Sequence, residues 1–197
     1  MRKGEATRQR VLDEAARQAA LKGLAGISLG DVADAVGLSK SGLFKHFDSK
    51  EAMQLALVDQ VLEQFTSFVL TAGQEVPPGR ARLERMFDLW LDWSEQEWPD
   101  TGCPLITFGM ELDDQPGLLR DRLQQGLLAW RRKMIAEMRN LTTPALSEAE
   151  AQAAYFQMKS FVLGHSDARR MMGDTDARRS AHAAFDALLD RTGRRAA

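Results

Sequence analysis

The chain has 197 residues, of which 44% are hydrophobic, 27% charged and 7% aromatic. This size and composition are typical of a globular protein, and they exclude collagen-like and wholly disordered chains. No apolar run approaches the ~18–20 residues that a membrane-spanning helix needs, and the first residues do not predict a secretory signal. A single cysteine excludes an internal disulfide, so we expect a protein of the reducing cytoplasm with no membrane partner.

The charges are divided unevenly along the chain. The net charge is −2, which by itself argues against a nucleic-acid-binding protein. Residues 1–50, however, hold nine basic and six acidic side chains, whereas residues 51–197 hold 17 and 22. A basic N-terminal part and an acidic remainder indicate that the two parts have different partners.

The pattern of apolar residues predicts an all-α fold of about nine helices. All six prolines lie beyond residue 76, where they separate long helical stretches, and no alternating run rich in Val, Ile or Thr predicts a strand. Ser28, Asp48 and Ser147 each precede an acidic residue by three positions, which is typical of a helix start. Apolar residues at the helical spacing predict helices over about 5–22, 29–35, 40–46, 49–71, 79–98, 105–114, 117–140, 147–172 and 175–191.

Residues 27–47 have the pattern of two short helices joined by a tight turn. Gly37 occupies a turn position that favours a left-handed conformation, Leu38 would fill the corner, and Ser39 would cap the second helix. The inward-facing positions are apolar, namely Val32, Ala33, Val36, Leu43 or Phe44, and Phe47. This arrangement is that of a helix-turn-helix.

The outward face of the second short helix carries short and cationic residues, which are Lys40, Ser41, Gly42, Lys45 and His46. Such a face fits the DNA major groove, ~12 Å wide, where hydroxyl and ammonium groups meet base edges and phosphates. The N-terminus of the helix adds partial positive charge toward phosphate. The alternative is a helical hairpin that only packs for stability and whose Lys and Ser side chains are solvated.

Further residues stand at fixed spacings around this segment. They are Thr7-Arg8, Ser28, Val36-Gly37-Leu38-Ser39 and Phe44-Lys45-His46-Phe47-Asp48-Ser49-Lys50-Glu51. Over about 45 residues this set resembles the N-terminal domain of the TetR (tetracycline-repressor) family of transcriptional regulators. The resemblance implies a three-helix DNA-binding domain over residues 1–48 and a larger helical ligand-binding and dimerisation domain over residues 49–197.

The resemblance also implies which side chains contact DNA. Those expected at bases or at the phosphate backbone are Ser28, Lys40, Ser41, Gly42, Phe44, Lys45, His46 and Lys50. Phe44 stands where the family more often has tyrosine, so a hydroxyl contact to phosphate is missing at that position.

The second domain is rich in aromatic and methionine side chains, which most often fill a helical core. The resemblance implies in addition a ligand cavity among its helices, whose occupation changes the spacing of the two DNA-binding heads. The expected lining residues are Phe87, Trp90, Trp93, Phe108, Met110, Trp130, Met134 and Phe161. We expect a small apolar or amphipathic effector and no cofactor.

The last two predicted helices are rich in small residues, which allow close packing against a partner. The resemblance implies a four-helix interface between two identical subunits, with interface residues Ala154, Met158, Ala181, Ala184, Phe185 and Leu188. Such a dimer presents two recognition helices ~34–36 Å apart, so its double-stranded DNA operator would be pseudo-palindromic.

The sequence therefore predicts a dimeric, sequence-specific DNA-binding regulator, a repressor released by a small-molecule effector. One alternative is a ligand-blind regulator or an activator with the same N-terminal domain; another is a helical-bundle enzyme or apolar-ligand carrier. No acid–base or metal constellation is visible, so we expect neither an enzyme nor a metal site. Cys103 is expected to be a half-buried residue at a helix start, and Glu111, Asp113 and Asp114 a solvated helix end.

Overall fold

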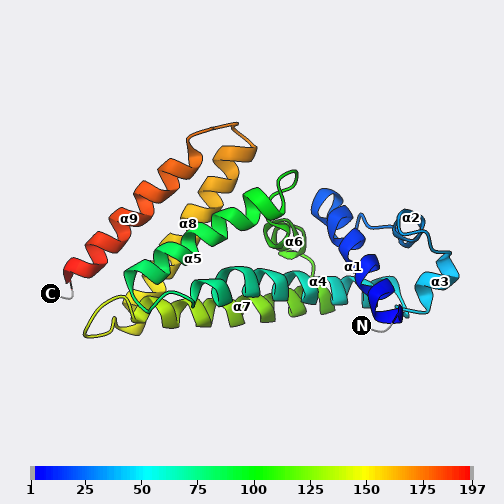
Figure 1. The fold of residues 1–197 in the computed structure, drawn as a ribbon, viewed down its shortest axis with the longest axis horizontal. Helices are drawn as coiled ribbons and strands as arrows, with labels where there is room; N and C mark the ends of the chain where they lie inside the picture. The colour runs from blue at the N-terminus through cyan, green and yellow to red at the C-terminus, as the bar shows by residue number, and fades with distance from the viewer. Residues whose placement is uncertain (1–2, 196–197) are drawn as a thin grey trace. The chain divides into compact units, whose positions relative to one another are not determined.

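The computed structural model describes residues 3–195, which form nine α-helices and two short π-helical segments, with no strand among them (Figure 1). The all-α expectation is confirmed. No helix in this part of the chain is long and apolar enough to cross a membrane. The elements are α1 (Lys3–Lys22), α2 (Leu29–Ala35), α3 (Lys40–Phe44), α4 (Lys50–Thr66), η1 (Ser67–Thr71), α5 (Arg80–Asp92), η2 (Trp93–Glu97), α6 (Pro104–Leu112), α7 (Leu118–Arg139), α8 (Glu148–Arg170) and α9 (Ala177–Arg195).

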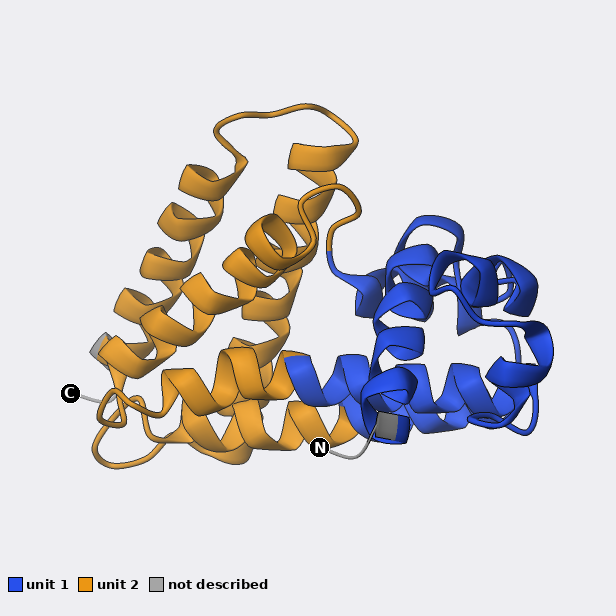
Figure 2. Cartoon of the chain, turned by 45° about the vertical axis from the view of Figure 1, so that its right-hand side comes forward, with its two compact units in different colours: residues 1–64, 103–127 blue, residues 65–102, 128–197 orange. Residues whose placement is uncertain are grey.

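The chain divides into two compact units (Figure 2). The first comprises residues 1–64 and 103–127, and the second comprises residues 65–102 and 128–197. The predicted boundary after residue 48 lies inside the first unit, which continues to residue 64. This unit also includes α6, which packs against α1. The division into residues 1–48 and 49–197 was made by expected function, and it stays a prediction.

The first unit is organised around α1, which packs against both α2 and α6. One face of α1 is apolar and fully or almost fully buried, with Val11, Leu12, Ala15, Ala16 and Ala19. The small alanines allow neighbouring helices to approach closely, while Arg8, Asp13 and Arg17 on α1 are exposed. This packing supports the two short helices α2 and α3, which are too short to be stable alone.

The second unit contains α5, α8 and α9, with α8 and α9 side by side along much of their length (Figure 1). The start of α8 has a complete capping box: the Ser147 side chain accepts from the backbone N–H of Glu150, and the Glu150 carboxylate accepts from the backbone N–H of Ser147. The serine and glutamate spacing seen in the sequence therefore sets this helix start.

Two of the predicted long helices end in π-helical turns. The helix predicted over residues 49–71 is α-helical to Thr66 and π-helical over η1, and that predicted over 79–98 changes at Trp93 to η2. The rings of Phe68 in η1 and Trp93 in η2 have their centroids 5.7 Å apart. Apolar spacing does not distinguish α- from π-helical turns over five residues. Such π-helical turns are frequent at functional sites.

Candidate nucleic-acid interface and helical core

The α2–turn–α3 segment has capped helix starts and a tight turn. Ser28 caps α2 and Ser39 caps α3, where its Oγ accepts from the backbone N–H of Gly42 at 3.0 Å. Gly37 adopts a φ of +70°, and the N–H of Leu38 then donates to the carbonyl of Ala33 at 2.8 Å. Because glycine enters the left-handed region at little cost, the turn forms without strain. These features define a helix-turn-helix.

Two apolar side chains anchor α3 and the residues after it. Leu43 and Phe47 are buried, whereas Phe44 is 47% exposed. The sequence did not decide whether Leu43 or Phe44 anchors this helix to the core. The structure shows that Leu43 does so and that Phe44 lies on the outward face. The helix ends at Phe44 rather than at residue 46.

The outward face of α3 carries the residues that the sequence predicted. Lys40, Ser41 and Lys45 are exposed, while Gly42 and His46 are partly exposed. The Ser41 hydroxyl lies 3.0 Å from the capping hydroxyl of Ser39. Cations and hydroxyls at the N-terminal end of such a helix are suited to phosphate oxygens and base edges.

Two of the expected phosphate-contacting residues have partners within the chain. Ser28 Oγ accepts from the backbone N–H of Asp31 at 3.4 Å, which is its role as a cap. The Lys50 ammonium donates to the carbonyl of Ala25 at 2.7 Å. Their contacts with DNA stay predictions, and the structure adds for Lys50 a contact that the sequence did not predict.

Two arginines of α1 contact the helix-turn-helix segment and the residues directly after it. Arg10 Nη2 donates to the carbonyl of Val36 at 2.8 Å, which satisfies a carbonyl at the end of α2. The Arg8 guanidinium lies 4.9 Å from the centre of the Phe47 ring, within the range of a cation–π contact. The sequence analysis named Arg8 only as part of a motif and did not assign Arg10 any role. Their positions three residues and one residue before Val11 gave no direct signal of either contact.

The acidic end of α6 differs from the expected solvated helix end. Glu111 accepts two hydrogen bonds of 2.6 Å from the backbone N–H groups of Leu24 and Ala25. Asp113 and Asp114 are exposed, as expected. Residues 3–195 contain no group of His, Cys, Asp or Glu side chains placed to hold a metal ion. Cys103, at the start of α6, is buried rather than half-buried.

Three of the expected ligand-lining residues belong to one aromatic cluster in the second unit. Trp90, Trp93 and Trp130 surround Phe65, with ring centroids 5.5, 5.6 and 4.6 Å from that of Phe65. Trp98 extends the cluster, 6.0 Å from Trp93. Edge-to-face contacts of this kind stabilise a core, and they also form flat apolar walls.

The other expected lining residues lie elsewhere. Met134 is buried and Phe161 is partly exposed in the second unit, and Phe87 stacks on Phe185. Phe108 and Met110 belong to the first unit. Met110 is 70% exposed, because α6 turns this position toward solvent, so its side chain lies outside the packed interior in which we expected it.

Two indole groups of the aromatic cluster are buried without a polar partner. Within residues 3–195, the Nε1 atoms of Trp93 and Trp98 have no hydrogen-bond acceptor. An indole N–H is a donor only, and leaving it unpaired in an apolar interior costs free energy. Both groups are therefore suited to an acceptor oxygen on a bound molecule.

A charged network lies beside this cluster in the second unit. Glu95 in η2 accepts from Arg178 of α9 at 2.8 Å and lies 2.7 Å from Nε2 of His165 in α8. Burial tends to raise the pKa of Glu95, but the hydrogen bonds from Arg178 and His165 outweigh burial and lower it. Burial lowers the pKa of His165, which favours the neutral ring.

The expected dimer interface falls largely on buried positions of α8 and α9. Five of its six residues, Ala154, Met158, Ala181, Phe185 and Leu188, are buried within their own chain, and only Ala184 is partly exposed. Ala154 and Leu188 also line a surface pocket between α8 and α9, so a dimer interface at these residues stays a prediction. The opposite face of α8 is exposed and carries Phe156, which is 71% exposed, and Leu163.

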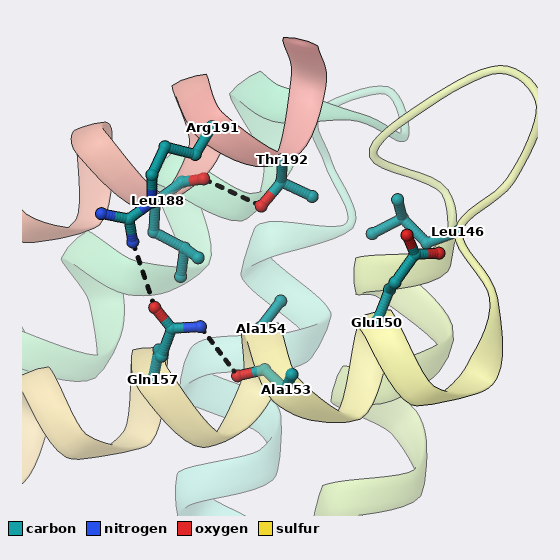
Figure 3. A pocket seen from close by; sticks show the side chains of 8 residues that line it. All are labelled: Leu146, Glu150, Ala153, Ala154, Gln157, Leu188, Arg191 and Thr192. Carbon is teal, nitrogen blue, oxygen red and sulfur yellow. Dashed lines mark hydrogen bonds between the residues drawn. The ribbon is translucent and has the colours of Figure 1, made fainter. Parts of the chain in front are cut away.

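A pocket of about 200 Å³ lies between α8, α9 and the loop before α8 (Figure 3). Arg191 Nη2 donates to the Gln157 side chain at 3.1 Å and so links α9 to α8 across it. Its lining residues are Leu146, Glu150, Ala153, Ala154, Gln157, Leu188, Arg191 and Thr192. It is distinct from the aromatic cluster.

An N-terminal helix-turn-helix followed by a helical body defines the class of helix-turn-helix regulators. Within this class, the family described as bacterial regulatory proteins, tetR family, matches residues 11–57. The family described as tetracyclin repressor-like, C-terminal domain, matches residues 79–185. The chain therefore belongs to the TetR family of transcriptional regulators, which are not enzymes.

Individual proteins agree with this assignment. The chain is 43% identical over 83 residues to the HTH-type transcriptional repressor KstR2 of Rhodococcus jostii (strain RHA1), an alignment that spans 40% of this chain and 39% of that repressor. A TetR transcriptional regulator from Chloroflexus aurantiacus J-10-FL has 25% identity and a TM-score of 0.79 over 96% of both chains. AibR, solved in complex with isovaleryl coenzyme A and operator DNA, shares the fold with 18% identity and a TM-score of 0.72, over 93% of this chain and 98% of that chain.

Proposed function

We propose that this protein binds a specific DNA operator through α3 and represses transcription until a small molecule releases it. The observation that carries the proposal is the exposure of Lys40 and Ser41 at the serine-capped start of α3 and of Lys45 directly after its end. Cations and hydroxyls in that position suit phosphate and base edges in the major groove. The name of the partly aligned relative, a transcriptional repressor, supports repression over activation.

The effector site is proposed to lie at the aromatic cluster of the second unit. Trp90, Trp93 and Trp130 supply apolar walls, and the unpaired indole N–H groups of Trp93 and Trp98 supply donors for an acceptor oxygen. This combination favours an amphipathic molecule with a carbonyl, carboxylate or ether oxygen. AibR, which has the same fold, was solved with an acyl-coenzyme A ligand, and this supports a ligand-binding role for such a body.

The working form is proposed to be a homodimer that pairs the outer faces of α8 and α9. Phe156 and Leu163 are seven residues apart, so they lie on one side of α8, and both are exposed in the single chain. Large exposed apolar side chains in line on a helix are typical of a protein–protein contact. A two-fold pair would present two recognition helices to a pseudo-palindromic operator.

The proposal is tested with a duplex that the wild-type protein selects from a random 30-base-pair library. We expect Lys40→Ala and Lys45→Ala each to weaken binding of this duplex by about 5- to 100-fold at fixed salt, as for loss of ~1–3 kcal/mol of contact free energy. Lys133→Ala, which removes the same charge from the exposed face of α7, is the matched control and should bind as wild type does. Unchanged affinity in both α3 variants would show that α3 does not enter the groove.

The release step is tested on the same duplex with a panel of small amphipathic molecules. A molecule that binds the aromatic cluster should change tryptophan fluorescence and lower DNA affinity together, because the two sites are then coupled. A fluorescence change without loss of DNA affinity would contradict release. If no member of a chemically broad panel changes either signal, the ligand-blind alternative is supported instead.

A further inference from the structure

The turn between α1 and α2 is held by side chains from two helices that follow much later in the chain. From α6, the Glu111 carboxylate accepts from the N–H groups of Leu24 and Ala25, both at 2.6 Å. From α4, Gln54 Nε2 donates to the carbonyl of Leu24 and Lys50 Nζ donates to the carbonyl of Ala25, both at 2.7 Å. All four backbone polar groups of this dipeptide are thus bonded to side chains within the first unit.

The conformation of Gly23 makes the Glu111 contact possible. Gly23 ends α1 with a φ of +76°, which a residue with a side chain rarely adopts. A Cβ atom at this position would also lie 2.6 Å from Glu111 Oε2, too close for any real contact. A left-handed residue after a helix turns successive N–H groups outward as an anion-binding concavity, and here a carboxylate of the same chain occupies it.

The turn at Leu24 and Ala25 directly precedes the helix-turn-helix, so its conformation affects where α2 begins. Ile27, two residues after Ala25, is buried, and Ser28 then caps α2. Because α2 packs against both α1 and α3, the direction in which the chain leaves this turn affects where α2, and through it the recognition helix α3, is placed. Hydrogen bonds from N–H groups to a charged carboxylate are about twice as strong as neutral ones.

We propose that Glu111 is a positioning residue for DNA binding: it never touches DNA, and its carboxylate on α6 fixes the α1–α2 turn so that α2 and α3 are held in the orientation that fits the groove. This inference rests on the proposed function. It assigns a role to an acidic residue whose sequence pattern predicted only solvation, and it makes α6 part of the DNA-binding unit.

The test is the Glu111→Gln variant, measured on the duplex selected by the wild-type protein. An amide has one acceptor oxygen, so one of the two N–H groups loses its partner while the size of the side chain is kept. We expect DNA affinity to fall at least tenfold, and hydrogen exchange at the amides of Leu24 and Ala25 to become faster while the amides of the α1 core keep their protection. Asp113→Asn removes a charge from the exposed end of the same helix and should change neither signal.

A graded variant separates positioning from simple loss of stability. Glu111→Asp keeps the carboxylate but shortens its reach, so it should bind the duplex with an affinity between those of wild type and Glu111→Gln. If Glu111→Gln does not fold, the affinity and the Leu24 and Ala25 exchange of Glu111→Asp decide the question. If a Glu111 variant exchanges the amides of Leu24 and Ala25 fast but still binds the duplex with wild-type affinity, the inference is overturned and the proposed function is not. Failure of the wild-type protein to select any duplex overturns the proposed function and the inference with it.

Discussion

The rings of Phe87 and Phe185 stack on each other, with centroids 4.2 Å apart and an angle of 24° between their planes. Phe87 comes from α5 and Phe185 from α9, and both are fully buried in the second unit. The sequence analysis expected the first in a ligand cavity and the second at a partner surface. The stack shows that α9 is joined to α5 by a shared aromatic core, while both expectations stay predictions.

Removing one ring of this stack should destabilise the second unit. We expect Phe185→Ala to lower the free energy of unfolding by about 3–5 kcal/mol, since the lost burial adds to the cost of the cavity left behind. Urea denaturation at fixed protein concentration measures the change. Met171→Ala is the control, because this side chain is 84% exposed after α8, and its effect should stay within ~0.5 kcal/mol. Equal midpoints for Phe185→Ala and wild type would contradict a core role for the stack.

The helices could be predicted from the sequence because their signals are local. Ser28, Ser39 and Ser147 cap the helices they were expected to cap, and Gly37 has the left-handed conformation that its turn required. The outward face of α3 could be predicted from the same local pattern, because Leu43 on α3 and Phe47 just after it are both buried.

The side chains that meet across the fold could not be predicted in this way. On α8, Ala154 and Met158 form one apolar face while Ala153 and Phe156 form another, and only packing against neighbouring helices shows that the first is internal. Likewise, Glu111 lies 86 and 87 residues from the two amides it binds. Periodicity gives the faces of a helix, but it does not give the partner of each face.

Phe44 provides a test in which DNA affinity should increase. Its ring is 47% exposed on the outward face of α3, at the position where the family more often has tyrosine. We expect Phe44→Tyr to bind the selected duplex about 2- to 10-fold more tightly, since a new hydrogen bond to phosphate is worth ~0.5–1.5 kcal/mol. The slope of affinity against salt should stay the same, because no charge is added.

The control for this substitution is Phe44→Leu, which keeps an apolar side chain at the same exposed position but adds no hydroxyl. It should not bind more tightly than the wild-type protein does. If Phe44→Tyr binds no more tightly than wild type, position 44 does not approach the phosphate backbone, and the expected docking of α3 would need revision.

Phe156 also tests the proposed dimer. Its side chain is exposed in the single chain, midway along α8 and in line with Leu163. We expect Phe156→Glu to convert the dimer into a monomer at micromolar concentration, because the pair would bury two unpartnered carboxylates. Analytical ultracentrifugation measures the mass. Met172→Glu, at another exposed apolar position beyond α8, should leave the mass unchanged.

Dimer loss should weaken operator binding without unfolding the subunit. Two half-sites are then bound independently, and the gain from linking them is lost. Circular dichroism of Phe156→Glu should show the helical content of wild type. A wild-type protein that sediments as a monomer would contradict the dimer itself, and a dimeric Phe156→Glu would place the interface elsewhere.

The buried pair of His165 and Glu95 should make stability depend on pH. The unfolded chain binds a proton at histidine near pH ~6.5, whereas burial lowers the pKa of His165 in the folded chain below this value. As pH falls below about 6.5, the unfolded state takes up the proton first, so the free energy of unfolding decreases until the folded ring is also protonated. Glu95, whose pKa is also lowered, adds stability that is present above its unfolded pKa of ~4.5 and is lost only at lower pH.

The His165→Gln variant isolates the histidine contribution to this pH dependence. Glutamine offers an amide N–H toward Glu95 but does not titrate, and the cations nearby, Arg169 and Arg178, are unchanged. We expect the urea midpoint of wild type to fall between pH 7.5 and 5.5 and that of His165→Gln to fall less, because only the wild-type chain has a histidine whose pKa is lowered on folding. Parallel curves over the whole range would show that the folded chain binds the histidine proton as readily as the unfolded chain does. A wild-type midpoint that rises on acidification would reverse the sign, and it would mean that the attraction of Glu95 for the imidazolium outweighs its burial.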